Sequence, residues 1–109
     1  MIRVIATINL KPGRREAFLA ALRANVPNVL AESGCREYAP MADLASGLPP
    51  QIPLRPDTIT IVEAWDSLDH LRVHLSGLPH MLRYKEATRD MVAGVSLQVL
   101  QPVVQSVTL

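Results

Sequence analysis

The chain has 109 residues, of which 49% are hydrophobic and only 4% aromatic, and its formal net charge is +1. This length predicts one domain, residues 1–109, with a core built mainly from aliphatic side chains. The balance of 11 basic and 10 acidic residues, without a basic run, argues against nucleic-acid binding. Apolar runs are too short for a membrane span, and the first residues read as a strand and not as a signal peptide. With Cys35 as the single cysteine, we expect a cytoplasmic protein without internal disulfides.

The first part of the chain predicts a strand followed by a long helix. Residues 2–10 carry apolar side chains on both faces, which is typical of a strand covered on both sides. Asn9 is the polar exception on its face, and it either completes hydrogen bonds at the strand end or lines a pocket. An apolar stripe predicts a helix over 14–32, and Gly34 is the expected left-handed residue that stops it.

Two contrasting segments follow. Residues 35–41 predict a second strand, in which alternation places Cys35 and Tyr38 on opposite faces. Residues 42–57 contain four of the nine prolines and are too apolar for a flexible linker. We interpret this inserted loop either as a lid over a pocket or as an arm that packs against a neighbouring chain.

The third strand is expected at 58–65, where β-branched residues alternate. A short helix capped by Asp66 or Ser67 should follow it, with an apolar stripe on one side. That stripe consists of Leu68, Leu71 and Leu75.

The end of the chain predicts one more helix and one more strand. The helix is expected over 79–91, since proline is favoured at a first helical position. Gly94 should end it before a strand over 95–101. The apolar tail 103–109 is expected to pack on a partner subunit.

The predicted order is therefore β-α-β-β-α-β, with the second crossover divided between two helices. This order is typical of the ferredoxin-like α+β fold, in which helices cover one face of a four-stranded antiparallel sheet. The opposite face of the sheet is also apolar, so we expect a second copy of the chain to cover it.

Candidate functional residues gather between Glu63 and His80, where the only tryptophan and all three histidines lie. His70 and His74 are four residues apart and could converge on zinc, but no glutamate occupies the position that a His-Glu-x-x-His site requires. We therefore predict no metal site. The purely structural interpretation of these residues is a tryptophan in the core beside a half-buried histidine whose hydrogen bonds are satisfied. The functional interpretation is that Trp65, His74, His80 and Tyr84 line one apolar cavity suited to a flat aromatic molecule.

Five short motifs in order resemble the antibiotic biosynthesis monooxygenase family, and together they span most of residues 2–102. They are Leu10-Lys11-Pro12-Gly13-Arg14, Gly34-Cys35-x-x-Tyr38, Val62-Glu63-Ala64-Trp65 followed by Leu68 and Leu71, His74-Leu75-Ser76, and Pro79-His80. The resemblance implies a homodimeric α+β barrel, with two sheets packed face to face and C-terminal strands exchanged. It also implies oxidation of polyphenols to quinones by molecular oxygen without a cofactor.

The resemblance makes Trp65 a catalytic candidate, and His74 joins it because an imidazole titrates near neutrality and could remove a phenolic proton. Some family members have a polar residue four positions before this tryptophan, where this chain has Ile61. Haem-degrading relatives place an axial histidine where Tyr84 stands here, which disfavours haem breakdown. The expected substrate-binding residues are Asn9, Tyr38, Glu63, His80 and Tyr84.

The sequence thus favours a cofactor-independent monooxygenase acting on a small aromatic or quinol-type substrate. Two alternatives stay open: a non-catalytic dimer that binds a small apolar ligand, and a cofactor-free isomerase on the same scaffold.

Overall fold

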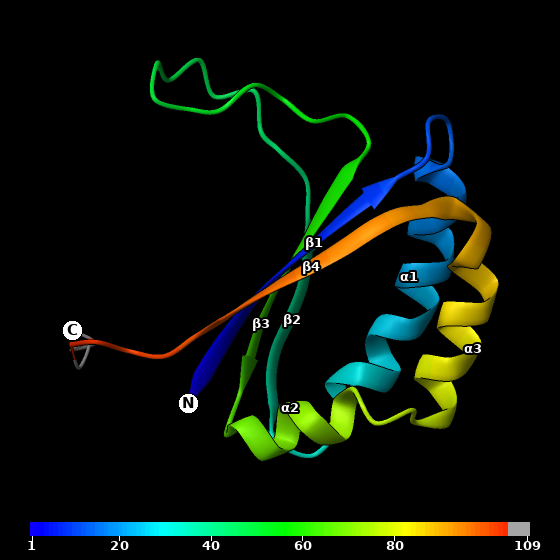
Figure 1. Cartoon of the computed structure of the whole chain (residues 1–109), viewed down its shortest axis with the longest axis vertical. Coiled ribbons are helices and arrows are strands. Elements are labelled where there is room, and N and C mark those ends of the chain that lie inside the picture. The colour runs from blue at the N-terminus through cyan, green and yellow to red at the C-terminus, as the bar shows by residue number, and fades with distance from the viewer. Residues whose placement is uncertain (105–109) are drawn as a thin grey trace.

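The computed structural model describes residues 1–104, in which the helices lie together on one face of a single sheet (Figure 1). The antiparallel strands are β1 Ile2–Leu10, β2 Cys35–Met41, β3 Thr58–Trp65 and β4 Val92–Leu100. The helices are α1 Arg15–Leu30, α2 Leu68–His74 and α3 Pro79–Thr88, and the 3-10 turn η1 spans Arg89–Met91. The strand order β2-β3-β1-β4 confirms the predicted ferredoxin-like fold.

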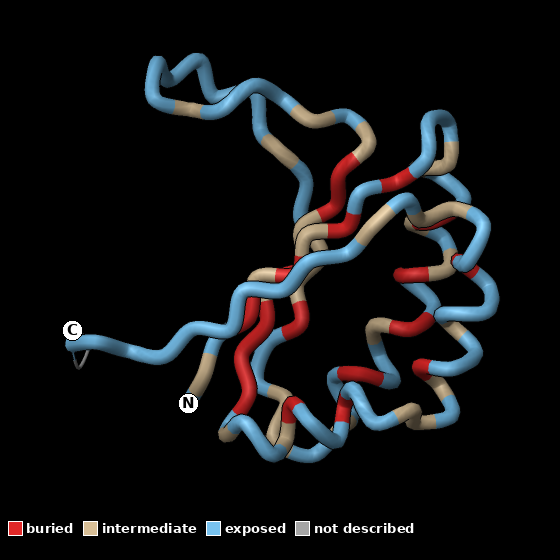
Figure 2. Tube along the Cα trace, in the orientation of Figure 1, coloured by how far each residue is buried: buried red, intermediate tan, exposed pale blue. Residues whose placement is uncertain are grey.

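The core forms between the sheet and the helices because alternate strand residues point toward α1 and α3. β1 and β3 supply most of the sheet side, and α1 supplies most of the helix side (Figure 2). The most deeply buried large side chains are Trp65, Phe18, Leu22, Ile59, Ile61, Val4 and Val29. Each such burial stabilises the fold by about 1.5–3 kcal/mol, so this aliphatic layer holds the sheet and the helices together.

The other face of the sheet is only partly covered within residues 1–104. The strand pairing places Ile5 opposite Val62 and Val62 opposite Ala39, so an apolar row crosses three strands on this face. All three residues are half-buried. Both faces of β1 were predicted to be covered, but residues 1–104 cover only the face toward the helices fully.

Two local predictions were wrong, each for a backbone reason. A bulge in β2 shifts the register, so that Cys35 pairs with Trp65 while Glu37 pairs with Ala64. Because the bulge adds one residue, Cys35 and Tyr38 share the face toward the helices instead of lying on opposite faces. Gly94 does not end the last helix, because it lies within β4, after α3 and η1.

The short helix α2 begins after Ser67, whose hydroxyl accepts the backbone N–H of His70 at 3.3 Å. Of its predicted apolar stripe only Leu71 is buried, whereas Leu68 and Leu75 are 43% and 45% exposed. A two-turn helix has room to bury one narrow face, and here Leu71 and His74 occupy it.

The inserted loop 42–57 extends away from the sheet and helices as an arm (Figure 1). Asp43 joins its two ends by accepting the backbone N–H and the guanidinium of Arg55 at 2.9–3.0 Å. Four large apolar side chains of the arm face solvent, namely Leu44, Leu48, Ile52 and Leu54.

At the C-terminus, Val103 and Val104 are exposed. The rest of the tail predicted to pack on a partner, residues 105–109, lies outside the described residues. No helix in residues 1–104 has the length and apolar character needed to cross a bilayer.

Candidate active site

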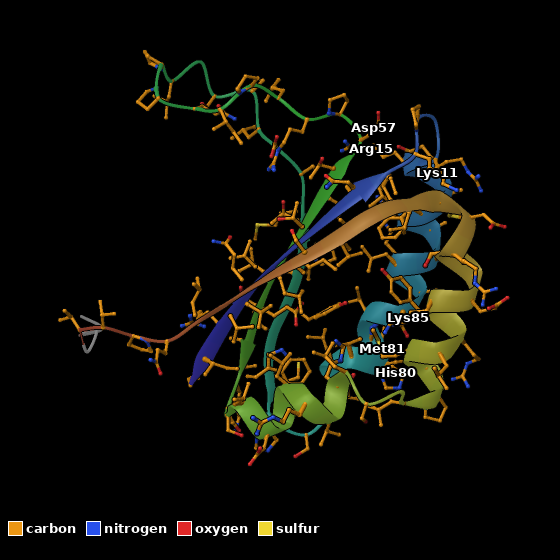
Figure 3. The ribbon with its side chains drawn as sticks, viewed as in Figure 1. Lys11, Arg15, Asp57, His80, Met81 and Lys85 are labelled. Carbon is orange, nitrogen blue, oxygen red and sulfur yellow. The ribbon has the colours of Figure 1, made fainter. Side chains whose placement is uncertain are left out.

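A cavity of about 500 Å³ lies between the helix-covered face of the sheet and α3. Its wall is largely apolar, with Ala6, Ile8 and Ile61 on the sheet side and Met81 on α3. Lys85 and Arg89, both exposed, supply positive charge at its edge, and Figure 3 shows Met81 and Lys85 on α3. The polar groups on the remaining wall are Tyr38, Glu63, His74, Tyr84 and Thr88.

His74, the last residue of α2, lines the cavity with a side chain that is only 3% exposed. Its ring packs against Trp65 at a centroid distance of 4.8 Å and meets the edge of Tyr38 at 5.7 Å. Nδ1 lies 2.9 Å and 3.1 Å from the two carboxylate oxygens of Glu32. With Nδ1 engaged by Glu32, Nε2 is the ring nitrogen left for a molecule in the cavity.

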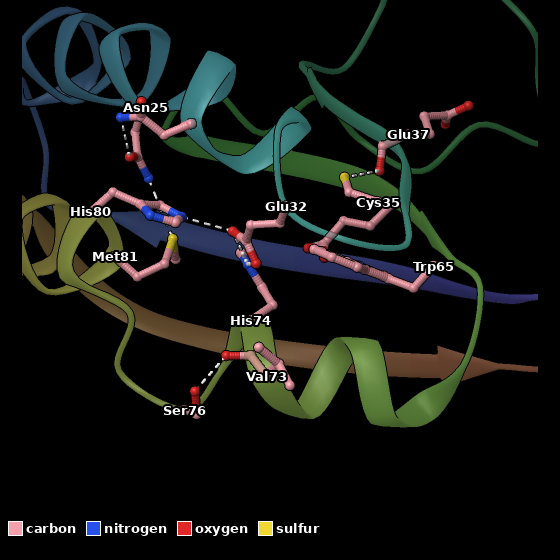
Figure 4. A network of polar contacts seen from close by, with 12 residues as sticks. Asn25, Glu32, Cys35, Glu37, Trp65, Val73, His74, Ser76, His80 and Met81 are labelled. Atoms are coloured by element: carbon pink, nitrogen blue, oxygen red, sulfur yellow. Dashed lines mark hydrogen bonds and ion pairs between the residues drawn. The ribbon is translucent and has the colours of Figure 1, made fainter.

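Glu32 is a site residue that the sequence analysis missed. It follows α1 by two residues, and its carboxylate lies between His74 and His80 (Figure 4). Nε2 of His80 is 2.7 Å from Glu32 Oε2, and the Glu32 side chain is 8% exposed. We call Glu32, His74 and His80 the Glu32 cluster. A carboxylate at a helix end, shortly before the Gly-Cys step, was the available signal, but no periodic pattern assigns it to His74, 42 residues away.

Trp65 and Glu63 form a second polar contact beside the cavity. Trp65 Nε1–H donates to Glu63 Oε1 at 2.9 Å, and the tryptophan is completely buried. Burial raises the pKa of the Glu63 carboxyl, an effect that the Trp65 hydrogen bond and the nearby His74 partly oppose. Glu63 is therefore a partly desolvated acid on a largely apolar wall.

The two tyrosines of the wall remain protonated at neutral pH. Burial, followed by the charge of Glu63, raises the pKa of Tyr38 far above its ordinary range and that of Tyr84 to about 12. Phe18 packs edge-on against Tyr84 at 6.2 Å and limits its movement. Both hydroxyls can therefore donate hydrogen bonds to oxygen atoms of a bound molecule.

The structure brings four of the seven predicted site residues to the cavity wall: Tyr38, Glu63, His74 and Tyr84. Trp65 lies behind His74 and Glu63, and His80 reaches the site through Glu32. Asn9 points to the opposite face of the sheet, where its Oδ1 accepts the Thr58 hydroxyl at 3.0 Å. Of the two readings of Asn9, this geometry matches the strand-end amide.

The two histidines of α2 engage different partners. His70 Nδ1 lies 2.7 Å from Ser67 Oγ, whereas His74 contacts Glu32. Within residues 1–104, no group of three or more His, Cys, Asp or Glu side chains is arranged so that it could hold a metal ion. Cys35, half-buried, has a pKa raised to about 11 by burial, so its thiol stays protonated.

This arrangement combines an apolar slot, an imidazole whose Nε2 has no hydrogen-bond partner among residues 1–104, and two phenolic donors. Such a wall can hold a flat aromatic molecule and accept a proton from one of its hydroxyl groups.

Comparison with known proteins agrees with this chemistry. The family model described as antibiotic biosynthesis monooxygenase matches residues 1–87. The Escherichia coli K12 protein "Probable quinol monooxygenase YgiN" is 43% identical over 104 residues, covering 94% of this chain and 98% of that relative. The Shigella flexneri protein of the same name matches equally well.

Solved structures share the architecture as well. Rv0793 from Mycobacterium tuberculosis is 28% identical, with a TM-score of 0.75 over 97% of this chain and 98% of that one. PA3566 from Pseudomonas aeruginosa is 26% identical, with a TM-score of 0.76 over 94% of both chains.

Proposed function

Because the chain belongs to the antibiotic biosynthesis monooxygenase family, we propose that it is a cofactor-independent monooxygenase that oxidises a quinol-type aromatic substrate with molecular oxygen. The observation that carries the proposal is the position of His74 on the wall of an apolar cavity, with an Nε2 that no side chain of the described residues engages. The name of the Escherichia coli relative supports a quinol as the substrate class.

In the proposed reaction His74 Nε2 removes a proton from a substrate hydroxyl. The resulting phenolate is electron-rich and reduces oxygen, and a carbon–oxygen bond forms on the ring. The O–O bond of this ring-bound peroxide then breaks while the same ring carbon loses its hydrogen as a proton, which leaves a new carbonyl. One oxygen atom therefore stays in the quinone product, and the other departs, takes up the ring proton and becomes water. The proton held by His74 returns to the departing oxygen, and the enzyme ends in its starting state.

The other predicted residues take supporting roles in this proposal. Tyr38 and Tyr84 bind substrate oxygen atoms as hydrogen-bond donors, and Glu63 accepts from a substrate hydroxyl. Trp65, which the family resemblance makes a catalytic candidate, acts by supporting His74 and Glu63 from behind the wall.

We also propose that the active form is a homodimer. The half-buried apolar row that crosses three strands on the open face of the sheet supports this. Light scattering should give twice the chain's 12.0 kDa. A monomer at micromolar concentration would contradict the proposed assembly.

The cytoplasmic location expected from the sequence stays a prediction.

Oxygen uptake with a panel of hydroquinones tests the reaction. His74→Ala should lower kcat by about 100-fold or more, as expected for loss of a general base. His70→Gln is the matched control, since His70 lies on the same helix but outside the cavity wall. Label from ¹⁸O₂ should appear in the quinone.

Two results would contradict the proposal. Hydrogen peroxide without label in the product would indicate an oxidase. Tight binding of hydroquinones without oxygen uptake would favour the ligand-binding alternative.

A further inference from the structure

The Glu32 cluster joins three helices at one carboxylate. Glu32 follows α1, His74 is the last residue of α2, and His80 is the second residue of α3. Oε2 of Glu32 lies 2.9 Å from His74 Nδ1 and 2.7 Å from His80 Nε2 (Figure 4). All three side chains are at least four-fifths buried.

We propose that Glu32 is a positioning residue for His74, and this rests on the proposed function of that histidine. The carboxylate holds a proton on Nδ1, so that Nε2 is unprotonated and turned to the cavity. It also stabilises the imidazolium that forms when His74 takes a substrate proton, and His80 fixes the carboxylate from its other side.

The first argument is the hydrogen-bond geometry. An ionised carboxylate only accepts, so a ring nitrogen 2.9 Å from Glu32 must carry the hydrogen. A neutral imidazole has one N–H, which leaves the other nitrogen as the base. The contact with Glu32 thus selects the tautomer that can act on a molecule in the cavity.

The second argument is the charge around the cluster. Within residues 1–104, the ion pairs of Glu32 are to histidines alone, with no lysine or arginine. Besides the two histidines, the charge of Glu32 acts on Glu63, Tyr38 and Cys35, and the last two stay protonated because burial raises their pKa. The negative charge of Glu32 is therefore available to an imidazolium at His74.

The proton balance needs no further group. The substrate proton moves to His74 Nε2, the Nδ1 proton stays hydrogen-bonded to Glu32, and the Nε2 proton later leaves with the departing oxygen. Glu32 remains ionised throughout, which is the role of the orienting carboxylate in other carboxylate–histidine pairs.

The test compares Glu32→Gln with Glu32→Asp and with the His70→Gln control. In Glu32→Gln the side chain keeps its length but loses its charge and half of its acceptor capacity. We expect kcat to fall by about 10²-fold or more at an unchanged KM, because the loss acts on the proton transfer and not on binding. Glu32→Asp keeps the charge at shorter reach and should retain an intermediate kcat, whereas His70→Gln should match the wild type.

Nitrogen-15 NMR of the imidazole rings supplies a readout that does not depend on turnover. We expect the Nδ1–H tautomer at His74 in the wild type and in Glu32→Asp, and a shift toward Nε2–H in Glu32→Gln. An Nε2–H tautomer in the wild type would overturn the proposal, as would a Glu32→Gln variant with unchanged tautomer and kcat. If the wild type oxidises no quinol, the proposed function fails, while the tautomers still decide whether Glu32 positions His74.

Discussion

The Glu32 cluster and the arm both depend on a carboxylate that joins distant parts of the chain, but in opposite surroundings. Asp43 binds Arg55 within a loop that projects into solvent, whereas Glu32 binds two imidazoles where the ends of three helices meet. The pair in the arm is half-buried and contributes little to stability, because water still reaches and competes for both charges. A buried acceptor cannot be lost without leaving its donors unsatisfied, so it constrains the geometry of the site far more strongly.

The largest expected difference between the two regions lies in the packing of their apolar side chains. Trp65→Ala removes a completely buried ring from behind His74 and should destabilise the protein by about 3–5 kcal/mol. Leu48→Ala, at an arm side chain that is 66% exposed, should change stability by less than about 0.5 kcal/mol. Urea unfolding of the two variants measures both values. Equal losses would mean that the arm packs on something that residues 1–104 do not show.

The two carboxylates provide the next comparison. Glu32→Ala should cost about 1–3 kcal/mol, because two largely buried imidazoles lose their partner. Asp43→Ala should unfold at nearly the same urea concentration as the wild type, since the Arg55 guanidinium regains water. A destabilised Asp43→Ala together with an unaffected Glu32→Ala would reverse the interpretation of both regions.

Because the carboxyl of Glu63 is largely buried, we expect the stability of the protein to depend on pH. Burial raises its pKa in the folded protein above the ordinary value of 4.5, so the folded state holds this proton more tightly than the unfolded state. The stability that Glu63 contributes is therefore complete when the pH is below 4.5, and it is lost as the pH rises through the raised pKa of the folded state.

Glu63→Gln keeps an oxygen that can accept from Trp65 Nε1–H, and it removes this titration. The variant should gain stability relative to the wild type as the pH rises from 4 to 7, measured by thermal unfolding. A constant difference across this range would show that Glu63 does not titrate in it.

The smallest effect is expected in the arm and should be local. Arg55 lowers the pKa of Asp43, so the pair keeps its charge until the pH falls through that lowered value. Below it, the backbone N–H of Arg55, which donates to Asp43 at 3.0 Å, should lose its protection relative to the intrinsic exchange rate at the same pH. Hydrogen exchange at this amide measures the change, while global stability should show no matching step.

Much of the fold is readable from the sequence because the strands carry period-two patterns. The predicted strand bounds 2–10, 35–41 and 58–65 match β1, β2 and β3. The bulge in β2 was missed because it depends on how β2 pairs with β3 and not on the pattern within β2 itself. Gly94 was misread because glycine is tolerated within an edge strand as well as at a helix end.

The site was predictable where one segment brings its residues together. His74 and Tyr84 follow from helix spacing, and both line the cavity. Glu32 could not be found in this way, because it reaches His74 only through the meeting of three helix ends. For Asn9 the sequence left both interpretations open, because a polar residue in a strand does not reveal which face is enclosed, and its contact with Thr58 matches the strand-end amide.

The contact between the two rings of Trp65 and His74 also has a practical use. The chain contains a single tryptophan, so all of its indole emission comes from a ring whose centroid lies 4.8 Å from the imidazole. Protonated imidazoles quench indole fluorescence. Unlabelled protein should therefore report both the charge state of His74 and the arrival of a molecule beside it through its own emission.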